Sequence, residues 1–342
     1  MADKFQKIDA EGYLVSDEGH RLTDALFGQE FLSSISLTES FTLKSNYKNL
    51  DIFVEAFDQP YMIRHLEKSD SKLIGELPYG LKVELDSKSL CIDEWDRFHG
   101  LATNGVPFVF SRAAQVEFFD FLTEFDDDSV QIDGITYQTP NYYLDKEEVN
   151  REKFWSDIYR EEEPGWDLKA PASPLESIMA QLKLAKQRVL VLGCGRGHDA
   201  ALFAKQGHIV TAVDFSGEAI AGAKELYGNL NIEWVQANVF ELPSTLGKFD
   251  LIFEHTCYCA VSPTRRSELV RVWNKHLDEN GHLLGIFFTM SKRVGPPYGG
   301  SEWELSKRLS PHFQNRYWTR WRHSLPRRQG KELVVYAQKI TK

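Results

Sequence analysis

The sequence predicts an α/β protein in which a smaller α+β domain precedes a larger, mainly parallel, doubly wound sheet. Three observations predict this arrangement. From residue 188 onward, apolar runs of strand length alternate with helix-like stretches, a glycine-rich turn follows the first run, and an acidic residue ends the second run. Strands that alternate with helices form parallel sheets with right-handed crossovers. The stretch before residue 146 lacks this alternation and is expected to fold separately.

The larger domain, residues 146–342, is expected to supply the strands of the sheet. RVLVLG at 188–193 is an almost continuous apolar run, which is typical of a strand buried on both faces. Further strands are expected at 208–214, 232–238, 249–255, 282–288 and 331–340. The helices expected between them are 198–207, which Gly207 ends, 216–228, and 262–281, which ends in a glycine turn.

The smaller domain, residues 1–145, shows short strands and one helix. Residues 50–57 and 81–85 have the alternation and branched side chains of strands. SRAAQVEFFDFLTEF at 111–125 is expected to form an amphipathic helix that Ser111 caps. An Asp-Gly pair within SVQIDGITYQT predicts a hairpin. No cluster of residues with recognisable chemistry occurs here, so we expect residues 146–342 to bind a cofactor alone.

Charge is distributed unevenly along the chain. Residues 1–150 carry 29 acidic and 13 basic residues, a net charge of −16, whereas the remainder carries 21 acidic and 27 basic residues, a net charge of +6. Opposite charges favour docking of one domain on the other. Two solvated surfaces explain the same counts equally well. For the smaller domain, docking on the larger domain and self-association both stay open.

Composition excludes several classes of protein. The most apolar stretch, LLGIFF at 283–288, is too short to span a bilayer, and the polar N-terminal stretch does not resemble a signal peptide. The four cysteines form neither a disulfide framework nor a zinc pattern, so we expect a cytoplasmic protein without a metal. The basic stretch at 307–331 is interpreted as a surface connection, with base stacking on its aromatic residues as the alternative. We expect neither nucleic acid nor a membrane as a partner.

The glycine-rich turn indicates the kind of ligand. GCGRG at 193–197 lets a ligand approach the backbone closely. Asp214, which lies 21 residues after Gly193, is placed to bind a ribose diol, although NAD enzymes share both features. Asp199 opens the next helix, and a carboxylate there suits an ammonium group better than a pyrophosphate. Asn238 follows the third strand and can meet an adenine edge. Together these features favour S-adenosylmethionine.

Five stretches of the chain resemble the thiopurine S-methyltransferase family, and especially its halide and thiol methyltransferase branch. They are FWSDIYREEEPGWD, VLVLGCGRGHDAALFAKQGHIVTAVDFS, FDLIFEHTCYCAV, GPPYGGSEWELSKRL and RRQGKELVVYAQKI, which follow the family's order within about 151–342. The resemblance implies a class I methyltransferase fold, Rossmann-like, with a seven-stranded, mainly parallel sheet and an antiparallel last strand. It implies methyl transfer from S-adenosylmethionine to a small soft nucleophile, namely a thiol, sulfide, selenol or halide.

The resemblance also implies which residues bind the cofactor. Trp155, Tyr159 and Trp166 would cap it, because aromatic faces attract a sulfonium cation. Tyr159 stands where many relatives have tryptophan, and the spacing of Trp155 and Tyr159 alone fits a core stripe as well. The complete expected set is Trp155, Tyr159, Trp166, Leu192, Gly193, Cys194, Gly195, Asp214, Phe215, Asn238, Val239, Glu254 and His255.

His255 is the expected catalytic residue. It ends the fourth strand, where relatives place an arginine or tyrosine beside cofactor and acceptor, and a histidine there can take a thiol proton. A strand-end histidine bonded to the backbone is the structural alternative. Cys257 and Cys259 are expected to be packing residues, because burial raises the pKa of a thiol. The reaction needs alignment and exclusion of water more than a catalytic triad.

Other functions fit the same residues. The first is a methyltransferase for a different small-molecule acceptor, since the smaller domain could reshape the acceptor pocket. The second is a non-catalytic sensor that binds S-adenosylmethionine, which methyl transfer to any thiol would exclude. A dehydrogenase is a more distant alternative that NADH binding would reveal.

Overall fold

The computed structural model describes residues 4–69, 72–161 and 164–341. It divides into two compact units. Unit 1 comprises Met1–Leu144, Met290–Arg293 and Ser301–Glu304, and unit 2 comprises Asp145–Thr289, Val294–Gly300 and Leu305–Lys342. Each unit has its own buried apolar side chains. Two short segments from the C-terminal half of the chain therefore belong to unit 1, which the sequence pattern did not indicate.

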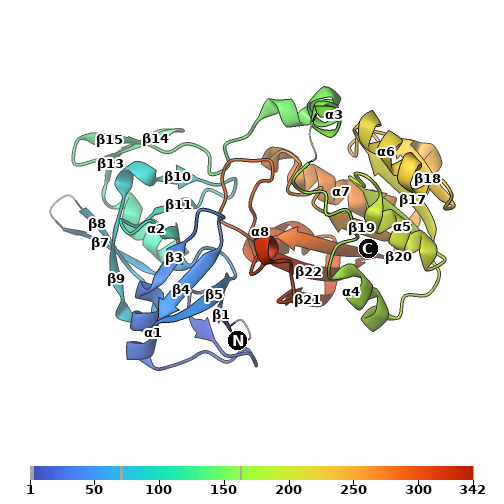
Figure 1. Ribbon diagram of the computed structural model, residues 1–342. Coiled ribbons are helices and arrows are strands. Elements are labelled where there is room, and N and C mark those ends of the chain that lie inside the picture. Colours follow the sequence, from blue (N-terminus) through green and yellow to red (C-terminus); the bar gives the residue numbers. More distant parts are fainter. Residues whose placement is uncertain (1–3, 70–71, 162–163, 342) are drawn as a thin grey trace. The chain divides into compact units, whose positions relative to one another are not determined.

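Unit 1 consists mostly of short strands, coloured blue to green in Figure 1. Its elements are β1 (Lys4–Ile8), β2 (Leu14–Val15), α1 (Ala25–Ser33), β3 (Ile35–Leu37), β4 (Leu43–Tyr47), β5 (Leu50–Ala56), β6 (Tyr61–Ile63), β7 (His65–Ser69), β8 (Lys72–Glu76), β9 (Lys82–Leu85), β10 (Cys91–Ile92), β11 (Phe98–Leu101), β12 (Pro107–Phe110), α2 (Arg112–Phe119), β13 (Leu122–Phe125), β14 (Ser129–Ile132) and β15 (Ile135–Gln138). Among its described residues, these strands form sheets in the orders β2-β1-β5-β4-β3, β10-β11-β12-β6, β7-β8-β9 and β13-β14-β15.

Several local signals in unit 1 are confirmed. The strands expected at 50–57 and 81–85 correspond to β5 and β9. Asp133 and Gly134 have φ values of 50° and 78° and join β14 to β15, as a two-residue hairpin turn with two positive φ values should. Ser111 caps α2, because its Oγ accepts a hydrogen bond from the backbone N–H of Ala114 at 3.2 Å.

The expected helix at 111–125 is too long. The helix α2 ends at Phe119, and Leu122–Phe125 forms strand β13, in which Leu122 pairs with Ile132 and Phe125 with Val130. Apolar residues three or four positions apart fit a helix, but FLTEF also has the aromatic and branched content of a strand. Pairing with β14 decides between the two, because it supplies backbone hydrogen bonds that a longer helix would forgo.

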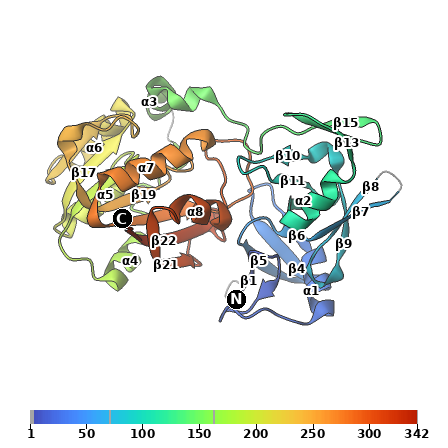
Figure 2. The ribbon, with the colours of Figure 1, turned by 180° about the vertical axis from the view of Figure 1, so that it is seen from behind.

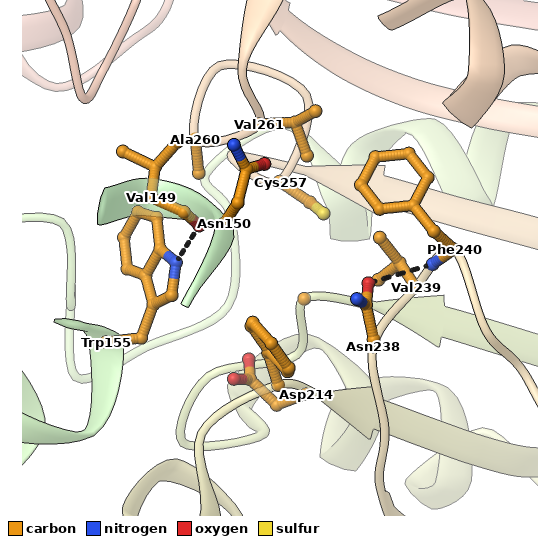
Figure 3. Close-up of a pocket in the computed structure, with 12 residues that line it drawn as sticks. Val149, Asn150, Trp155, Asp214, Asn238, Val239, Phe240, Cys257, Ala260 and Val261 are labelled. Atoms are coloured by element: carbon orange, nitrogen blue, oxygen red, sulfur yellow. Dashed lines mark hydrogen bonds between the residues drawn. The ribbon is translucent and has the colours of Figure 1, made fainter. Parts of the chain in front are cut away.

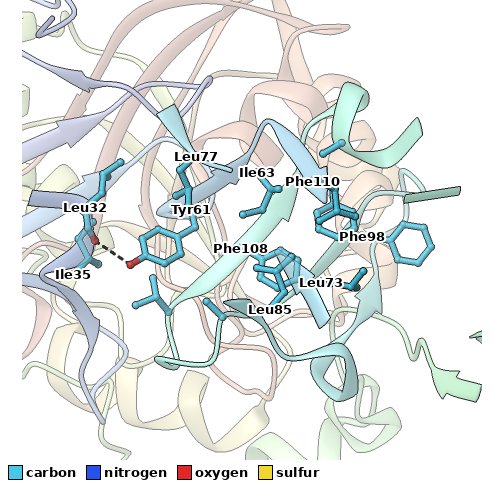
Figure 4. Close-up of a cluster of buried hydrophobic side chains, with 14 of the residues drawn as sticks. Leu32, Ile35, Tyr61, Ile63, Leu73, Leu77, Leu85, Phe98, Phe108 and Phe110 are labelled. Atoms are coloured by element: carbon cyan, nitrogen blue, oxygen red, sulfur yellow. Dashed lines mark hydrogen bonds between the residues drawn. The ribbon is translucent and has the colours of Figure 1, made fainter. Parts of the chain in front are cut away.

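The core of unit 1 is rich in aromatic rings (Figure 4). Phe98 of β11 and Phe110 of β12 both meet Phe118 of α2, with ring centroids 4.9 and 5.2 Å apart. Tyr61 of β6 is fully buried, and its hydroxyl donates to the carbonyl of Leu32 at 3.0 Å. Burial of such rings is a strong source of stability, and the hydroxyl loses no hydrogen bond on burial. Unit 1 therefore has a hydrophobic core of its own.

Unit 2 contains the longer strands and most of the helices. Its elements are α3 (Glu152–Glu161), α4 (Leu175–Leu182), β16 (Arg188–Leu192), α5 (His198–Lys205), β17 (Ile209–Asp214), α6 (Gly217–Tyr227), β18 (Ile232–Gln236), β19 (Phe249–His255), α7 (Arg266–His276), β20 (Leu277–Phe288), β21 (Phe313–Arg320) and β22 (Glu332–Lys339), with α8 (Glu302–Leu309) beginning in unit 1 and continuing in unit 2.

The strands of unit 2 form one sheet in the order β18-β17-β16-β19-β20-β22-β21 among the described residues. Neighbouring strands from β18 to β20 are parallel, and β22 is antiparallel to both β20 and β21. The chain crosses from β16 outward to β18 and then returns to β19 on the other side of β16. This reversal of strand order leaves room for a ligand at the carboxyl ends of β16 and β19.

Alternate residues of the central strands pack on opposite faces of the sheet. Leu190 and Leu192 of β16 belong to a cluster with Trp273 of α7, whereas Val189 and Val191 belong to a cluster with residues of α4 and α5. Accordingly, α4, α5 and α6 lie toward the viewer in Figure 1, and α7 and α8 lie toward the viewer in Figure 2. The continuous apolar character of β16 follows from this burial on both faces.

Two sequence-based expectations for unit 2 need correction. The helix expected at 262–281 is α7, which ends at His276, and Gly281 lies within β20, whose Leu277 pairs with Phe249 of β19. The stretch expected to be a surface connection contains β21 at Phe313–Arg320, the edge strand that pairs with β22. Gln314, Asn315 and Arg316 of this edge strand are exposed, so its composition resembles that of a loop.

Two glycines with positive φ allow a matched test of packing at the glycine-rich turn. Gly197 and Gly207 have φ values of 79° and 87°, but only at Gly197 would an added Cβ meet another group, the Trp234 ring at 2.5 Å. We expect Gly207→Ala to lower the free energy of unfolding by about 1–2 kcal/mol, the backbone cost alone. Gly197→Ala should cost more, because Trp234 must also move. Equal midpoint shifts in urea unfolding would contradict this assignment.

Candidate cofactor and acceptor site

A pocket opens in unit 2 at the carboxyl ends of its central strands (Figure 3). The space that it encloses together with its open mouth is about 570 Å³. The residues come from the turn before α3, from α3, and from the segments that follow β16, β17, β18 and β19. They are Val149, Asn150, Trp155, Gly193, Asp214, Phe215, Asn238, Val239, Phe240, Cys257, Ala260 and Val261.

The glycine-rich turn presents bare backbone to this pocket. Gly193 has a φ of 58°, and an added Cβ would lie 2.7 Å from the Cβ of Cys257. Gly195 has a φ of 53°, and an added Cβ would lie 2.9 Å from the hydroxyl oxygen of Tyr159. The backbone N–H of Cys194 donates to the carbonyl of Val213 at 2.9 Å, which ties the turn to β17. Glycine is required at both positions for conformation and for space.

Asp214, the last residue of β17, is the only carboxylate among the residues that line this pocket. Its Oδ2 accepts a hydrogen bond from the N–H of Gly195 at 2.8 Å, and its Oδ1 accepts one from the N–H of Ser216 at 2.9 Å. Burial raises its pKa, and the backbone donors partly offset that effect. Each carboxylate oxygen retains a further lone pair that can accept a hydroxyl of a bound ligand.

Three aromatic side chains lie next to the glycine turn. The Nε1–H of Trp155 donates to the carbonyl of Val149 at 2.8 Å (Figure 3), and the Nε1–H of Trp166 donates to the Tyr159 hydroxyl at 3.1 Å. The Trp166 ring meets both Trp155 and Tyr159 edge to face, with centroids 5.8 and 6.0 Å apart. Both indole N–H groups have acceptors, so the two tryptophan rings can cover a ligand without leaving a buried N–H unsatisfied.

The side-chain carbonyl of Asn238 is hydrogen-bonded to the neighbouring backbone. Its Oδ1 accepts the backbone N–H of Phe240 at 3.1 Å, as Figure 3 shows. The NH₂ group is therefore the half that can donate to a ligand in the pocket, and Val239 and Phe240 provide apolar surface beside it. This arrangement suits a flat heterocycle with an acceptor nitrogen at its edge.

Glu254 has a different role in the structure from the cofactor contact expected of it. It is fully buried, and its Oε1 accepts the backbone N–H of Tyr258 at 2.8 Å. Its Oε2 is buried without a hydrogen-bond partner within the described residues. Burial raises the pKa of Glu254 to about 8, so the carboxyl group is mostly protonated at neutral pH. Glu254 holds the turn that carries Cys257 rather than lining the pocket itself.

His255 is enclosed by two charged partners. Its Nδ1 lies 2.9 Å from Oδ2 of Asp199, and its Nε2 lies 2.7 Å from a guanidinium nitrogen of Arg328. Arginine can only donate, so Nε2 must be an acceptor and Nδ1 carries the proton that Asp199 accepts. Arg328 also donates to Glu332 at 3.1 Å and to the carbonyl of Trp166 at 3.4 Å. His255 does not line the pocket, and a proton could reach Nε2 only after Arg328 moves.

The structure brings together part of the expected site. Trp155, Gly193, Asp214, Phe215, Asn238 and Val239 line the pocket, whereas Tyr159, Trp166, Leu192, Cys194, Gly195, Glu254 and His255 lie outside its lining. Sequence reasoning missed Val149, Asn150, Phe240, Ala260 and Val261, and it treated Cys257 only as a packing residue. Apart from their position just beyond strand ends or beside α3, these residues carry no signal in the sequence.

The cysteines near the pocket are poor nucleophiles. Burial raises the pKa of the Cys257 and Cys194 thiols well above the usual value and that of Cys259 to about 12. Expecting Cys257 and Cys259 to be packing residues therefore agrees with their burial. In the described ranges, no group of three or more His, Cys, Asp or Glu side chains is placed to hold a metal ion. None of the described helices is both long and apolar enough to cross a membrane.

A profile of the thiopurine S-methyltransferase family matches residues 150–339, more than half of the chain. The chain belongs to this family. It is an S-adenosylmethionine-dependent methyltransferase. Its family membership covers nearly all of unit 2 and leaves residues 1–149 unmatched.

Curated relatives of this methyltransferase include plant and bacterial enzymes. Thiocyanate methyltransferase 1 of Arabidopsis thaliana is 30% identical over 54% of this chain and 84% of its own length. Probable thiol methyltransferase 2 of the same plant is 31% identical over 43% of this chain and 66% of its own length. Thiopurine S-methyltransferase of Legionella pneumophila (strain Paris) is 26% identical over 45% of this chain and 78% of its own length.

Two solved structures of methyltransferases are similar to this chain at lower sequence identity. The 1,6-didemethyltoxoflavin-N1-methyltransferase of Burkholderia thailandensis is 24% identical, with 64% of this chain and 99% of that chain covered and a TM-score of 0.45. The N-methyltransferase NodS from Bradyrhizobium japonicum WM9 is 16% identical, with 54% of this chain and 96% of that chain covered and a TM-score of 0.44.

The raised pKa of Glu254 makes stability depend on pH. An unfolded glutamate titrates near about 4.3, whereas folded Glu254 titrates at about 8. The folded chain therefore binds the extra proton, and stability falls as pH rises between these values. Glu254→Gln should remove this loss, so its free energy of unfolding should rise relative to wild type from pH 5 to pH 8. The control is Glu225→Gln, exposed on α6; parallel curves for all three proteins would refute the assignment.

Proposed function

We propose that unit 2 binds S-adenosylmethionine in the pocket of Figure 3 and transfers its methyl group to a small thiol or another small soft nucleophile. One observation supports this proposal most: Asp214, Asn238 and the bare backbone at Gly193 surround a single apolar pocket. The pocket lies at the carboxyl ends of parallel strands, where doubly wound sheets bind their ligands.

The residues of the pocket fit the adenosine part of the cofactor. Asp214 offers its carboxylate to the ribose hydroxyls, and the NH₂ of Asn238 can donate to a ring nitrogen of adenine. Phe215, Val239 and Phe240 supply apolar surface for the flat base. No polar group of the pocket other than Asp214 carries a full charge.

The aromatic residues beside the glycine turn fit the charged part of the cofactor. Trp155 lines the pocket, and Tyr159 lies beside Gly195 with Trp166 against it. Aromatic faces attract a positively charged sulfur and keep water from it. These residues would hold the methionine end, so the proposed roles of Tyr159 and Trp166 depend on a ligand that extends beyond the pocket lining.

The acceptor class rests on chemistry and on the relatives. Bound S-adenosylmethionine supplies a methyl group that its positive sulfur activates. A thiol with a pKa near about 8.5 is partly thiolate at neutral pH, so the chain needs chiefly to align the acceptor and exclude water. Matched relatives are named as thiol and thiocyanate methyltransferases, which supports a small sulfur nucleophile.

His255 is the proposed acceptor of the thiol proton. The unprotonated nitrogen of the ring is Nε2, which accepts a hydrogen bond from Arg328. Arg328 also donates a hydrogen bond to Glu332, and a shift of the guanidinium toward Glu332 would make Nε2 accessible to the thiol. Asp199 at Nδ1 would stabilise the imidazolium that forms. His255 therefore acts only in a state in which its contact with Arg328 is broken.

We expect Asp214→Ala to weaken S-adenosylmethionine binding by about 1.5–3 kcal/mol, or about 10- to 150-fold in Kd, which is typical of lost hydrogen bonds to a charged group. Isothermal titration calorimetry on the full chain measures this change. Asp214→Asn, which retains an acceptor oxygen, should lose less.

Asp278→Ala is the matched control, because Asp278 is an exposed residue near the amino end of β20, away from the carboxyl ends where Asp214 lies. It should bind the cofactor as wild type does. A folded Asp214→Ala variant with wild-type affinity would remove Asp214 from the site and with it the main support for this pocket.

His255→Ala should lower kcat/KM for a thiol by about 10²–10⁴ at neutral pH, the usual contribution of general acid–base catalysis. The loss should shrink as pH rises through the pKa of the acceptor thiol, because a thiolate needs no base. Cofactor affinity should change little. The measurement is radiolabelled methyl transfer to hydrogen sulfide, methanethiol, thiocyanate and iodide across pH.

Arg328→Gln is the comparison for this variant, because it breaks the same hydrogen bond without removing the imidazole. Any loss of kcat/KM in Arg328→Gln should not shrink as pH rises, in contrast to the loss expected for His255→Ala. If His255→Ala keeps full activity and an unchanged pH profile, the histidine is structural. Tight cofactor binding with no turnover on any acceptor would instead favour the sensor.

A further inference from the structure

The segment between β20 and α8 passes from one unit to the other and back. Met290–Arg293 and Ser301–Glu304 belong to unit 1, whereas Val294–Gly300 between them belongs to unit 2. A segment that is fixed at both ends has much less conformational freedom than one that is attached at one end only. The contacts of residues 290–293, 294–300 and 301–304 therefore show how unit 1 can influence unit 2 through this segment.

The first anchor in unit 1 is Met290–Arg293. The hydroxyl of Ser291 donates to Oε1 of Gln59 at 2.9 Å, and the guanidinium of Arg293 donates to the carbonyls of Tyr142 at 2.5 Å and Asn141 at 3.2 Å. The N–H of Leu144 donates a hydrogen bond to the carbonyl of Arg293 at 3.0 Å. Hydrogen bonds with a charged donor are among the stronger ones in proteins.

The second anchor in unit 1 is Ser301–Glu304. The N–H of Trp303 donates to the carbonyl of Phe57 at 2.9 Å, and the guanidinium of Arg97 lies 3.2 Å from the centroid of the Trp303 ring. The hydroxyl of Tyr143 donates to a carboxylate oxygen of Glu304 at 2.8 Å, and Glu304 is 4% exposed. The first anchor is thus half-buried and the second is partly buried, and both are hydrogen-bonded to other residues of unit 1.

The middle of the segment, Val294–Gly300, packs within unit 2. Tyr298 is fully buried, and its N–H donates to the carbonyl of Cys259 at 2.7 Å. Its hydroxyl accepts the N–H of Lys146 at 2.9 Å. The carbonyl of Gly299 accepts a hydrogen bond from Arg266 at 2.9 Å, and the guanidinium of this buried arginine lies 4.4 Å from the centroid of the Tyr258 ring.

Tyr298 and Arg266 thus hold the turn that follows β19. In that turn, the N–H groups of Ala260 and Val261 both donate to the carbonyl of Cys257, at 2.9 and 3.0 Å. Cys257, Ala260 and Val261 all line the pocket. Any shift of Tyr298 therefore moves one wall of the pocket, because its N–H is bonded to the backbone of the same turn.

We propose that unit 1 is a positioning domain for the methyltransferase: it fixes both ends of the segment whose middle supports the pocket wall at 257–261. Arg293 and Trp303 are the positioning residues on the unit 1 side, and Tyr298 is the one on the unit 2 side. A chain without residues 1–144 would lack the partners of both anchors. This proposal differs from the sequence-based expectation that residues 146–342 bind the cofactor alone, because it predicts weaker binding when unit 1 is absent.

The experiment uses the full chain with Arg293→Ala, which removes the two hydrogen bonds that the Arg293 guanidinium donates in the first anchor, and Tyr143→Phe, which removes one from the second. Hydrogen exchange should become at least about tenfold faster at the N–H groups of Tyr298, Ala260 and Val261. Calorimetry should show S-adenosylmethionine binding about 3- to 30-fold weaker. Arg293→Lys should recover part of both losses.

Matched controls in unit 1 are Arg21→Ala, which removes exposed ion pairs with Asp9 and Glu11, and Tyr47→Phe, which removes a hydrogen bond to Glu30. Neither should alter exchange at 257–261 or at Tyr298. Tyr143→Phe deletes a single oxygen atom, so it keeps the test valid if Arg293→Ala does not fold.

The proposal is overturned if exchange accelerates at 290–293 in Arg293→Ala but stays at the wild-type rate at Tyr298 and 257–261. The affinity measurement rests on the proposed cofactor pocket, whereas the exchange measurement does not. If Asp214→Ala binds the cofactor normally but exchange at 257–261 responds to Arg293→Ala, the cofactor site fails and the positioning role of unit 1 stands.

Discussion

The carboxylate of Asp214 is the interaction on which the rest of the site depends. By accepting the N–H groups of Gly195 and Ser216, it joins the loop after β16 to the loop after β17. Ser216 in turn caps α6 through the N–H of Ala219 at 3.2 Å and shares a hydrogen bond of 2.8 Å with the hydroxyl of Ser156 on α3. A single buried acid therefore fixes the glycine turn, the start of one helix and the helix that carries the aromatic residues.

A second constraint comes from the turn after β19, where polar groups serve the protein rather than the ligand. Glu254 is buried and bound to the backbone of Tyr258, and His255 is held between Asp199 and Arg328. The residues that reach the pocket from this turn are small or apolar. The pocket is thus shaped by buried hydrogen bonds behind it, and its chemistry follows from alignment and exclusion of water.

Sequence patterns predicted the local structure correctly where that structure depends only on residues close together in the chain. Ser111 caps α2, and Asp133–Gly134 forms a tight hairpin turn, because each depends on neighbouring backbone alone. The predictions were wrong where pairing with another strand determines the structure. Leu122–Phe125 forms a strand because it pairs with β14, and Phe313–Arg320 forms one because it pairs with β22. Nothing within these short stretches encodes the backbone partners that stabilise them as strands.

The strand–helix alternation, the glycine turn and the acid at the end of β17 could all be predicted from the sequence, because each is a local pattern of a few residues. The sequence also carried the family resemblance that the match at 150–339 confirmed. The fold was needed to show that Cys257, Ala260 and Val261 line the pocket and that Glu254 is buried outside its lining, bound to the backbone of Tyr258. It alone placed Met290–Arg293 and Ser301–Glu304 in unit 1, because those segments find partners more than 140 residues away along the chain.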